Sequence, residues 1–360
     1  MRLKETVQIG ASTGRLDSLD ALRGIAALAV VVYHLGYRVA EVYPEVGDPI
    51  DVLVAGQYGV QLFFVISGIV IFLSLHHVTP RTFLISRFIR LYPIYWVCAA
   101  VTFSAVAVIG LPGREVTAVE GAVNLTMLQA YLGVPHIDGA YWTLAAEIGF
   151  YVQVALLFFS TRLLRGRWLA VTLYAWIGLA TVASQVPKLL SGAIRDVTSQ
   201  LALGFVWIPL FVAGMAIYCL WSGRRSAPLM GVPLAATAVM ALRDPALGVA
   251  VLVCVLLVLL ALWGPPLGRL GKPLFFLGEI SYALYLIHQN VGFILIRWLT
   301  GLGLSHLVAA CLATFVVVAM ASLLTYLLDR PIRRALRRML LPQRETSRPS
   351  ASNPNSAKPA

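Results

Sequence analysis

The sequence predicts an all-α fold, a polytopic membrane helix bundle of about ten transmembrane helices with both termini in the cytoplasm. The composition is 59% hydrophobic and only 12% charged, whereas about a quarter of the residues of a soluble protein are charged. Apolar stretches of about 20 residues, long enough to cross a hydrocarbon core about 30 Å thick, recur along the chain. Lys and Arg gather in every second connection between these stretches, as in cytoplasmic loops. This composition argues against a soluble enzyme, a nucleic-acid-binding protein or a disordered scaffold.

The expected spans follow directly from the apolar stretches. The seventh is short for a complete crossing, and the half-apolar segment 122–140 is expected to be re-entrant or to lie on the membrane surface. In chain order, the ten expected spans cover residues 19–40, 52–75, 92–112, 141–161, 168–186, 200–221, 228–242, 246–263, 273–296 and 304–328.

The positive residues predict the orientation and the domain organisation. With a cytoplasmic N-terminus, 22 of the 28 Lys and Arg residues fall on the cytoplasmic side, so the net charge of +12 reflects topology and not contact with nucleic acid. We expect a cytoplasmic N-terminal segment at 1–17, a transmembrane domain at 18–330 and a disordered tail, rich in Pro, Ser and Asn, at 342–360. Residues 331–341 predict a basic cytoplasmic helix that contacts anionic membrane lipids. The alternative is a block of charge that only stops translocation.

Polar side chains within the spans are candidate functional residues, because each costs several kcal/mol in a membrane unless it is paired. Arg23 and His34 lie eleven positions apart, almost three helical turns, so they share one face of the first span. Helix lengths place His34, Glu147 and His288 at a similar depth near the outer side. The alternative is that these three side chains only hold helices together. The polar residues within the spans are Asp20, Arg23, His34, Gln57, Gln61, Ser67, Glu147, Gln153, Gln200, Glu279, Ser281, His288, Gln289 and Asn290.

A histidine and a carboxylate at equal depth suit general acid–base catalysis, since imidazole titrates near neutral pH and a carboxylate can orient it. His34 and Glu147 are therefore the candidate catalytic residues, with His34 activating a substrate hydroxyl. A proton-coupled transporter, with the same two residues as relay groups, is the alternative from another class. Such carriers often contain inverted repeats with broken helices, which we do not find in the sequence. No metal-binding motif is found either.

A second candidate site lies on the expected cytoplasmic side. Arg87 and Arg90 are three positions apart on one helical face, and guanidinium groups suit phosphate oxygens. The alternative is an ordinary positive anchor at the membrane surface. Similarly, the stretch GVQLFFVISG contains Ser67, but it is also compatible with a plain tight helix–helix contact built on Gly59, Ser67 and Gly68.

Five stretches, in this order, resemble motifs of the acyltransferase 3 family of integral membrane acyltransferases. They run from Arg15 to His288, and one departure from the family pattern is Thr143, where relatives often carry Ser. The matching stretches are RLDSLDALRGIAALAVVVYH, GVQLFFVISG, RFIRLYPIYW, YWTLAAEIGFY and EISYALYLIH.

The resemblance implies an O-acyltransferase of the bacterial cytoplasmic (inner) membrane. Such enzymes move an acyl group, usually acetyl, from cytoplasmic acyl-CoA to a hydroxyl of a cell-surface glycan, such as exopolysaccharide or lipopolysaccharide, or of a lipid-linked sugar. A macrolide-type small molecule is the alternative acceptor. No bound cofactor is implied, since acetyl-CoA is a substrate. The histidine that the family regards as essential corresponds to His34.

The resemblance also suggests roles for the other candidates. Arg87 and Arg90 are expected to bind the phosphates of acyl-CoA, with its thiol arm beside Arg23 and Ser67. His34 would act either as general base or as a nucleophile that carries the acyl group.

On the acceptor side we expect three further residues. Trp142 and Tyr151 follow from the motif that contains Glu147, and His288 from the last motif.

Overall fold

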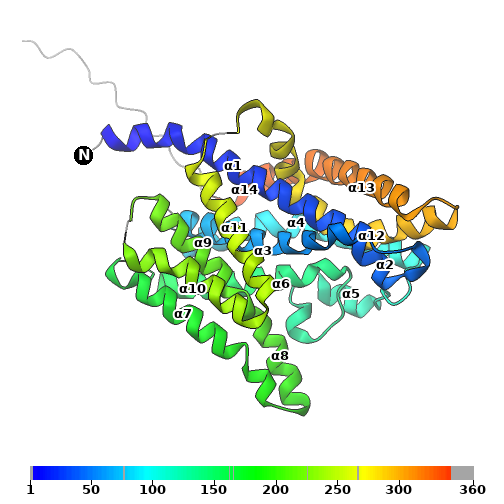
Figure 1. Ribbon diagram of the computed structural model, residues 1–360, viewed down its shortest axis with the longest axis horizontal. Coiled ribbons are helices and arrows are strands. Elements are labelled where there is room, and N and C mark those ends of the chain that lie inside the picture. Colours follow the sequence, from blue (N-terminus) through cyan, green and yellow to red (C-terminus); the bar gives the residue numbers. More distant parts are fainter. Residues whose placement is uncertain are drawn as a thin grey trace, which may run out of the picture.

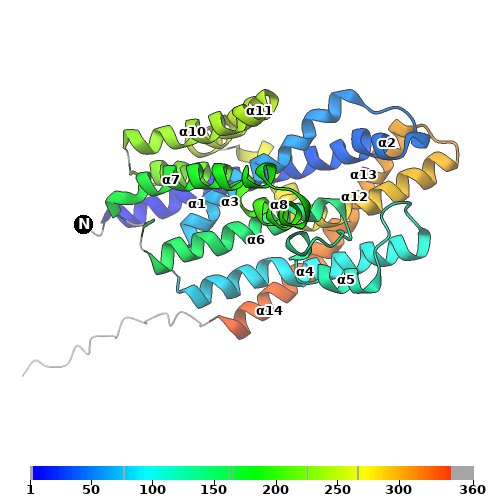
Figure 2. The same ribbon diagram turned by 90° about the horizontal axis from the view of Figure 1, so that it is seen from below.

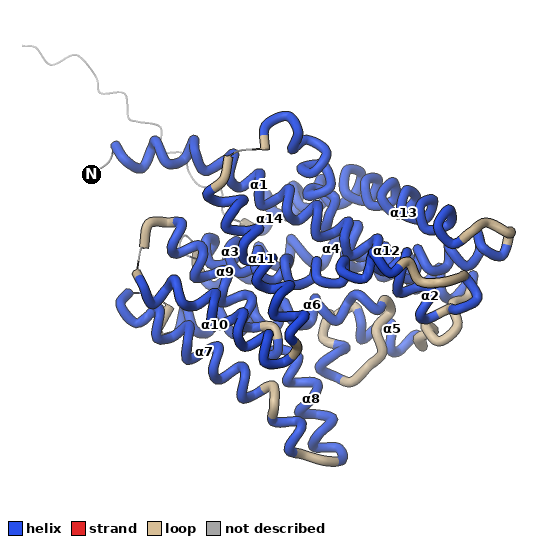
Figure 3. The backbone as a smooth tube through the Cα atoms, viewed as in Figure 1, coloured by secondary structure: helices blue, strands red, loops and turns tan. Residues whose placement is uncertain are grey.

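The computed structural model describes residues 3–75, 78–161, 163–164, 166–224, 226–265 and 267–341. Within these ranges the chain forms helices joined by short loops and contains no strand (Figures 1 and 3). The expected disordered tail lies outside the described residues. The helices are α1 (Leu3–Tyr33), α2 (Val39–Val42), α3 (Gly59–Leu75), α4 (Pro80–Ile109), α5 (Ala118–Asn124), α6 (Trp142–Ala155), α7 (Leu169–Ala183), α8 (Gly192–Val206), α9 (Ile208–Trp221), α10 (Ala227–Arg243), α11 (Pro245–Trp263), α12 (Lys272–Gly301), α13 (His306–Leu323) and α14 (Arg330–Leu340).

The all-α membrane bundle is confirmed. In the described part of the chain, eight helical segments are long and apolar enough to cross a membrane. The other two expected spans are also helical, since α10 covers the seventh and α12 covers the ninth. The α12 helix carries Lys272, Glu279 and Arg297, which lower its mean hydropathy, yet its central residues are buried in the bundle. It is therefore an inner helix whose polar residues face other helices.

Two boundaries differ from those expected. The α1 helix begins at Leu3 and runs on through the predicted N-terminal segment. The α4 helix begins twelve residues before the expected span, at Pro80, where the side chain of Thr79 accepts a hydrogen bond from the N–H of Thr82. This capping overrides the lower hydropathy of the first turns. Arg87 consequently lies within α4 and not in a connecting segment before it.

The segment 122–140 packs against the bundle with part of its side chains. It contains the end of α5 and short 3₁₀ turns, and its Asn124, Gln129 and Asp138 side chains are buried. Buried polar side chains need partners. The side-chain amide of Asn124 has them, since its Nδ2 donates to the carbonyls of Glu120 and Pro135 at 2.8 Å each and its Oδ1 accepts from the N–H of Ile137 at 3.1 Å.

Glycines determine how closely the helices approach. A side chain on Gly24 would meet Leu274 O at 2.5 Å, and one on Gly278 would meet Asp20 O at 2.1 Å, so α1 and α12 touch backbone to backbone. The two helices run side by side in both views (Figures 1 and 2). Ten residues beyond each glycine lie His34 and His288, and the same parallel packing brings these two together.

The predicted basic helix is present as α14. Its first residue, Arg330, forms an ion pair of 2.7 Å with Glu279 on α12, and Arg333 pairs with Asp329 at 2.8 Å. The helix lies next to α4 (Figure 2).

Candidate active site

A narrow inner cavity of about 80 Å³ lies between α1, α3, α4, α6 and α12. Glu147 is its carboxylate, and its Oε1 accepts hydrogen bonds from Ser67 at 2.9 Å and from Tyr151 at 2.5 Å. The Ser67 of the GVQLFFVISG stretch therefore faces a polar site, while Gly68 of the same stretch makes the tight helix contact with α9. The stretch therefore contributes both a polar side chain to the cavity and a tight helix–helix contact.

Three arginines line the same cavity. Arg23 on α1 forms an ion pair of 3.2 Å with Asp20. Among the described residues, neither Arg87 nor Arg90 forms an ion pair, and the guanidinium carbon of Arg87 lies 6.0 Å from the ring centroid of Tyr151. Half-buried guanidinium groups without a carboxylate partner favour an anionic ligand.

Another cavity, of about 140 Å³, adjoins this one. It shares Arg23, Arg90 and Tyr282 with the inner cavity and adds Arg330 and Arg333 of α14. Its lining also contains Asp20, Glu279 and Asp329, which form ion pairs with Arg23, Arg330 and Arg333, so Arg90 is the arginine of this lining that forms no ion pair with a described residue.

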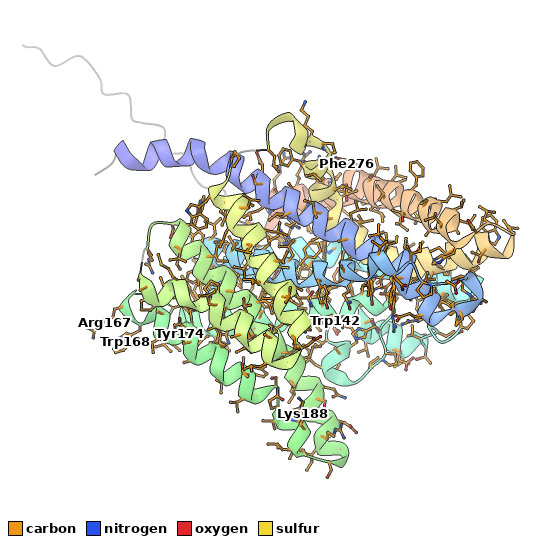
Figure 4. The ribbon with its side chains drawn as sticks, in the orientation of Figure 1. Trp142, Arg167, Trp168, Tyr174, Lys188 and Phe276 are labelled. Carbon is orange, nitrogen blue, oxygen red and sulfur yellow. The ribbon has the colours of Figure 1, made fainter. Side chains whose placement is uncertain are left out.

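The outer cavity is wider, about 390 Å³, and contains His34. Aromatic and amide side chains dominate its wall. Trp142, one of the aromatic residues, lies within the bundle, whereas Arg167 and Trp168 lie at the end of the molecule where α1 begins (Figure 4). The complete lining is Tyr33, His34, Arg38, Gln57, Tyr58, Val60, Gln61, Arg114, Gly139, Ala140, Trp142, Tyr285 and Gln289.

Hydrogen bonds define the protonation of the two histidines. Nδ1 of His34 lies 2.9 Å from the carbonyl of Val30, and Nδ1 of His288 lies 2.8 Å from the carbonyl of Tyr285. Because a carbonyl only accepts, both Nδ1 atoms carry hydrogen. Nε2 of His288 therefore accepts from Nδ1–H of His34, at 3.2 Å. In neutral His34 the remaining atom, Nε2, has a lone pair free for a substrate proton.

The chain immediately after His34 departs from α-helical geometry. Residues His34–Arg38 form a π-helical turn, a feature often found at functional sites. The imidazole is only partly buried, which leaves one edge open to the outer cavity.

Two residues, Val60 and Tyr285, line both the inner and the outer cavity. The Tyr285 hydroxyl is held by hydrogen bonds to Thr143 Oγ1 at 2.8 Å and to the carbonyl of Ala140 at 3.1 Å. These side chains form the boundary between an arginine-lined cavity and a histidine-lined one.

The structure separates two residues that the sequence analysis paired. His34 lies in the outer cavity and Glu147 in the inner one, and the partner of His34 is His288. The depth estimate for Glu147 took Tyr141 as the outer edge of the membrane. Tyr141 is fully buried, and its hydroxyl donates a hydrogen bond to the carbonyl of Leu286, so it does not mark an edge of the helix bundle.

Tyr151 also differs from its expected place. It was assigned to the acceptor side with Trp142, but nine residues of helix, a rise of about 13 Å, separate the two. Tyr151 therefore lines the inner cavity beside Glu147 and Arg87.

The sequence analysis missed Asp138, Tyr285 and Arg114. The Asp138 carboxylate, buried before α6, accepts hydrogen bonds from the N–H groups of Asn290 and Ala140. Tyr285 precedes His288 by three positions, a spacing that puts both on one helical face. Arg114 lies in a loop outside every apolar stretch, so no search for polar residues within spans could find it.

The fold and the two adjoining cavities define a multi-pass membrane protein with an arginine-lined inner cavity and a histidine-containing outer cavity. The family model of acyltransferase 3, described as an acyltransferase domain, matches residues 16–328. The chain belongs to the acyltransferase 3 family and is a membrane acyltransferase. No curated protein and no solved structure matches it.

Proposed function

We propose that this acyltransferase moves an acetyl group from acetyl-CoA to a hydroxyl of a cell-surface glycan or its lipid-linked precursor. The observation that carries the proposal is a pair of cavities that meet at Val60 and Tyr285. One is lined by Arg87 and Arg90, which form no ion pair with a described residue, and the other contains His34. A two-substrate transfer needs this division. One cavity accepts an anionic donor, and the other presents a base to the acceptor.

The donor binds at the inner cavity. Its phosphates contact Arg87 and Arg90 and extend toward the adjoining cavity that Arg333 lines. Guanidinium groups bind phosphate well. The inner cavity is narrow, which suits the thiol arm and not the nucleotide. Glu147 belongs to this donor side, where its hydrogen bonds hold Ser67 and Tyr151 in place.

His34 acts as the general base. Its Nε2 removes the proton of the acceptor hydroxyl as the acceptor oxygen attacks the thioester carbonyl. A new C–O bond forms, the C–S bond breaks, and the proton passes from Nε2 to the departing thiolate sulfur. His288 is a positioning residue that holds His34 in the required tautomer.

The orientation follows from the distribution of charge. The arginine-lined end faces the cytoplasm, where acyl-CoA is made, because 22 of the 28 Lys and Arg residues fall on that side when both termini are cytoplasmic. The outer cavity then opens to the opposite side of the bacterial cytoplasmic membrane, where a surface glycan or a lipid-linked sugar is available.

The test uses membrane vesicles that contain the full chain and its host's glycan, supplied with acetyl-CoA labelled in the acetyl group. Label should appear on glycan with the wild type and fall by at least about 100-fold in His34→Ala. His136→Asn, which changes a histidine of the loop that precedes the 3₁₀ turn Gly139–Tyr141 and lies outside both cavities, is the matched control and should retain transfer. Label that moves through the membrane without becoming bound to glycan would instead indicate a carrier.

A further inference from the structure

The outer cavity has an unbalanced charge. Arg38 and Arg114 belong to its lining, and among the described residues no Asp or Glu does. Arg38 forms an ion pair with Glu41, at 2.7 Å, but that carboxylate is not part of the wall. Half-buried Arg114 forms no ion pair with any described residue. An arginine in this setting is stabilised by an anion that enters with the ligand.

The same cavity contains amide oxygens without partners. The Oε1 atoms of Gln61 and Gln289 are buried and accept no hydrogen bond within the described chain, although both residues line the cavity. An unsatisfied buried acceptor costs about 1–3 kcal/mol, which a ligand that donates hydrogen bonds relieves. Gln289 is 4% exposed and packs against Gly139, where an added side chain would lie 2.5 Å from the Gln289 amide nitrogen. Hydroxyl groups are the donors that an acyl acceptor can supply.

Aromatic rings complete the wall. Trp142, Tyr33 and Tyr58 line the cavity beside the amides. Ring faces provide apolar surface, whereas the polar tips of tyrosines remain available for hydrogen bonds. The volume of about 390 Å³ accommodates a small ligand or the end of a longer chain. A purely apolar acceptor would leave both amide oxygens without a hydrogen-bond donor and Arg114 without an ion pair to the ligand.

We infer that the acceptor is an acidic saccharide, which places a carboxylate or phosphate beside Arg114 and its hydroxyls against Gln61 and Gln289. This inference rests on the proposed function and names the chemical class of its acceptor. The acceptor hydroxyl that reacts lies at Nε2 of His34, and the acid group lies at the arginine side of the same cavity. A neutral glycan would satisfy the amides but leave the arginine unpaired.

The experiment compares defined acceptors with the purified full chain in lipid nanodiscs and acetyl-labelled CoA thioester. The probes are an oligosaccharide of glucuronic acid, the neutral glucose oligosaccharide of the same linkage, and a glycosyl phosphate. We expect an acidic probe to have a kcat/KM about tenfold above that of the neutral probe. The glucuronic acid and glycosyl phosphate arms distinguish a carboxylate from a phosphate as the recognised group.

The variants test whether Arg114 is responsible. Arg114→Gln should reduce the acidic-to-neutral ratio about tenfold through KM for the acidic probe, and Arg114→Lys should keep most of the ratio because the charge remains. Arg195→Gln, at an exposed arginine of α8 outside the cavity, is the control and should keep the full ratio. Equal transfer to acidic and neutral probes, or an unchanged ratio in Arg114→Gln, overturns the inference and leaves the proposed function standing. Absence of label on every saccharide overturns the proposed function itself.

Discussion

Nδ1 of His34 lies 3.2 Å from Nε2 of His288, and the helices that carry them touch at Gly24 and Gly278, ten residues earlier in each. This equal spacing makes the two imidazoles meet. Nδ1–H of His34 is shared between Val30 O and Nε2 of His288, which leaves Nε2 of His34 with the lone pair. In the proposed mechanism His288 therefore positions His34.

A change at His288 tests this relationship. His288→Leu removes the acceptor for Nδ1–H of His34, so kcat should fall about 100-fold through loss of orientation, with KM for acetyl-CoA little changed. His288→Gln retains a side-chain acceptor and should recover part of the rate. The pH–rate profile is the second measurement. The part of the profile in which the rate rises with deprotonation of His34 should shift along the pH axis in His288→Leu. It should keep its position in Glu147→Gln, because Glu147 lies in the other cavity. A shift of this part in Glu147→Gln alone would restore the pairing of Glu147 with His34.

Removing one unpaired arginine should weaken donor binding. Arg87→Gln is expected to raise KM for acetyl-CoA about tenfold, because it deletes a charged contact to phosphate that is equally strong in the ground and transition states. Steady-state kinetics at saturating acceptor measure this. Arg81→Gln changes an exposed arginine on the same helix, outside the cavity, and provides the comparison. Equal KM values in the two variants would assign Arg87 to topology alone.

The contact between α3 and α9 should be intolerant of a methyl group. A side chain on Gly68 would lie 2.0 Å from Phe211 O, and one on Gly214 would lie 2.0 Å from Val65 O, so the backbones themselves must separate. Gly68→Ala should destabilise the bundle by about 1–3 kcal/mol or more. The readout is the temperature at which the detergent-solubilised chain loses its monodisperse peak. Gly178→Ala, at a helical glycine with open space around it, should leave that temperature unchanged or raise it.

Stability should depend on pH through Asp138, which precedes the span that begins at Gly139. Burial raises the pKa of this carboxyl to about 6, although the N–H groups of Asn290 and Ala140 oppose the shift. A raised pKa in the folded state means stability that is fully present below the unfolded pKa, near 3.8, and is lost as pH rises through about 6. The melting temperature should therefore fall between about pH 4 and 6 and then level off.

The variant Asp138→Asn cannot ionise, so its melting curve should lack this slope. It also replaces one acceptor oxygen by an amide NH₂, which leaves one of the two backbone N–H groups without a partner at a cost of about 1–3 kcal/mol. An identical slope in the variant would assign the pH dependence to another group.

The sequence is sufficient to predict the helices, because hydropathy and helical period act locally. It also predicts that Arg23 and His34 lie on one face of α1, and the two line the inner and outer cavities respectively. The level of His288 follows in the same way from its place on α12. These predictions need only a rise of 1.5 Å per residue and a helix that is straight.

The sequence does not reveal that Glu147 lines a different cavity from His34, because that placement depends on where the preceding loop enters the bundle. That entry is determined by tertiary hydrogen bonds, from Tyr141 to Leu286 O and from Asn290 to Asp138, which no local pattern reveals. The sequence analysis missed Arg114 for a related reason. It reaches the outer cavity from a loop, and loop positions follow from packing between elements distant in sequence.

The boundary that Val60 and Tyr285 form between the two cavities also bears on the leakage of ions through the protein. A cell that spends energy on an ion gradient cannot tolerate a continuous file of water through its membrane. Here an uncharged valine and a tyrosine hydroxyl, already bonded to Thr143 and Ala140, interrupt the polar route between the two cavities. An uncharged acyl group on a slender thiol arm can pass such a barrier, whereas a hydrated ion would lose its water there. The proposed transfer would therefore move an acyl group across the membrane while the membrane potential is preserved.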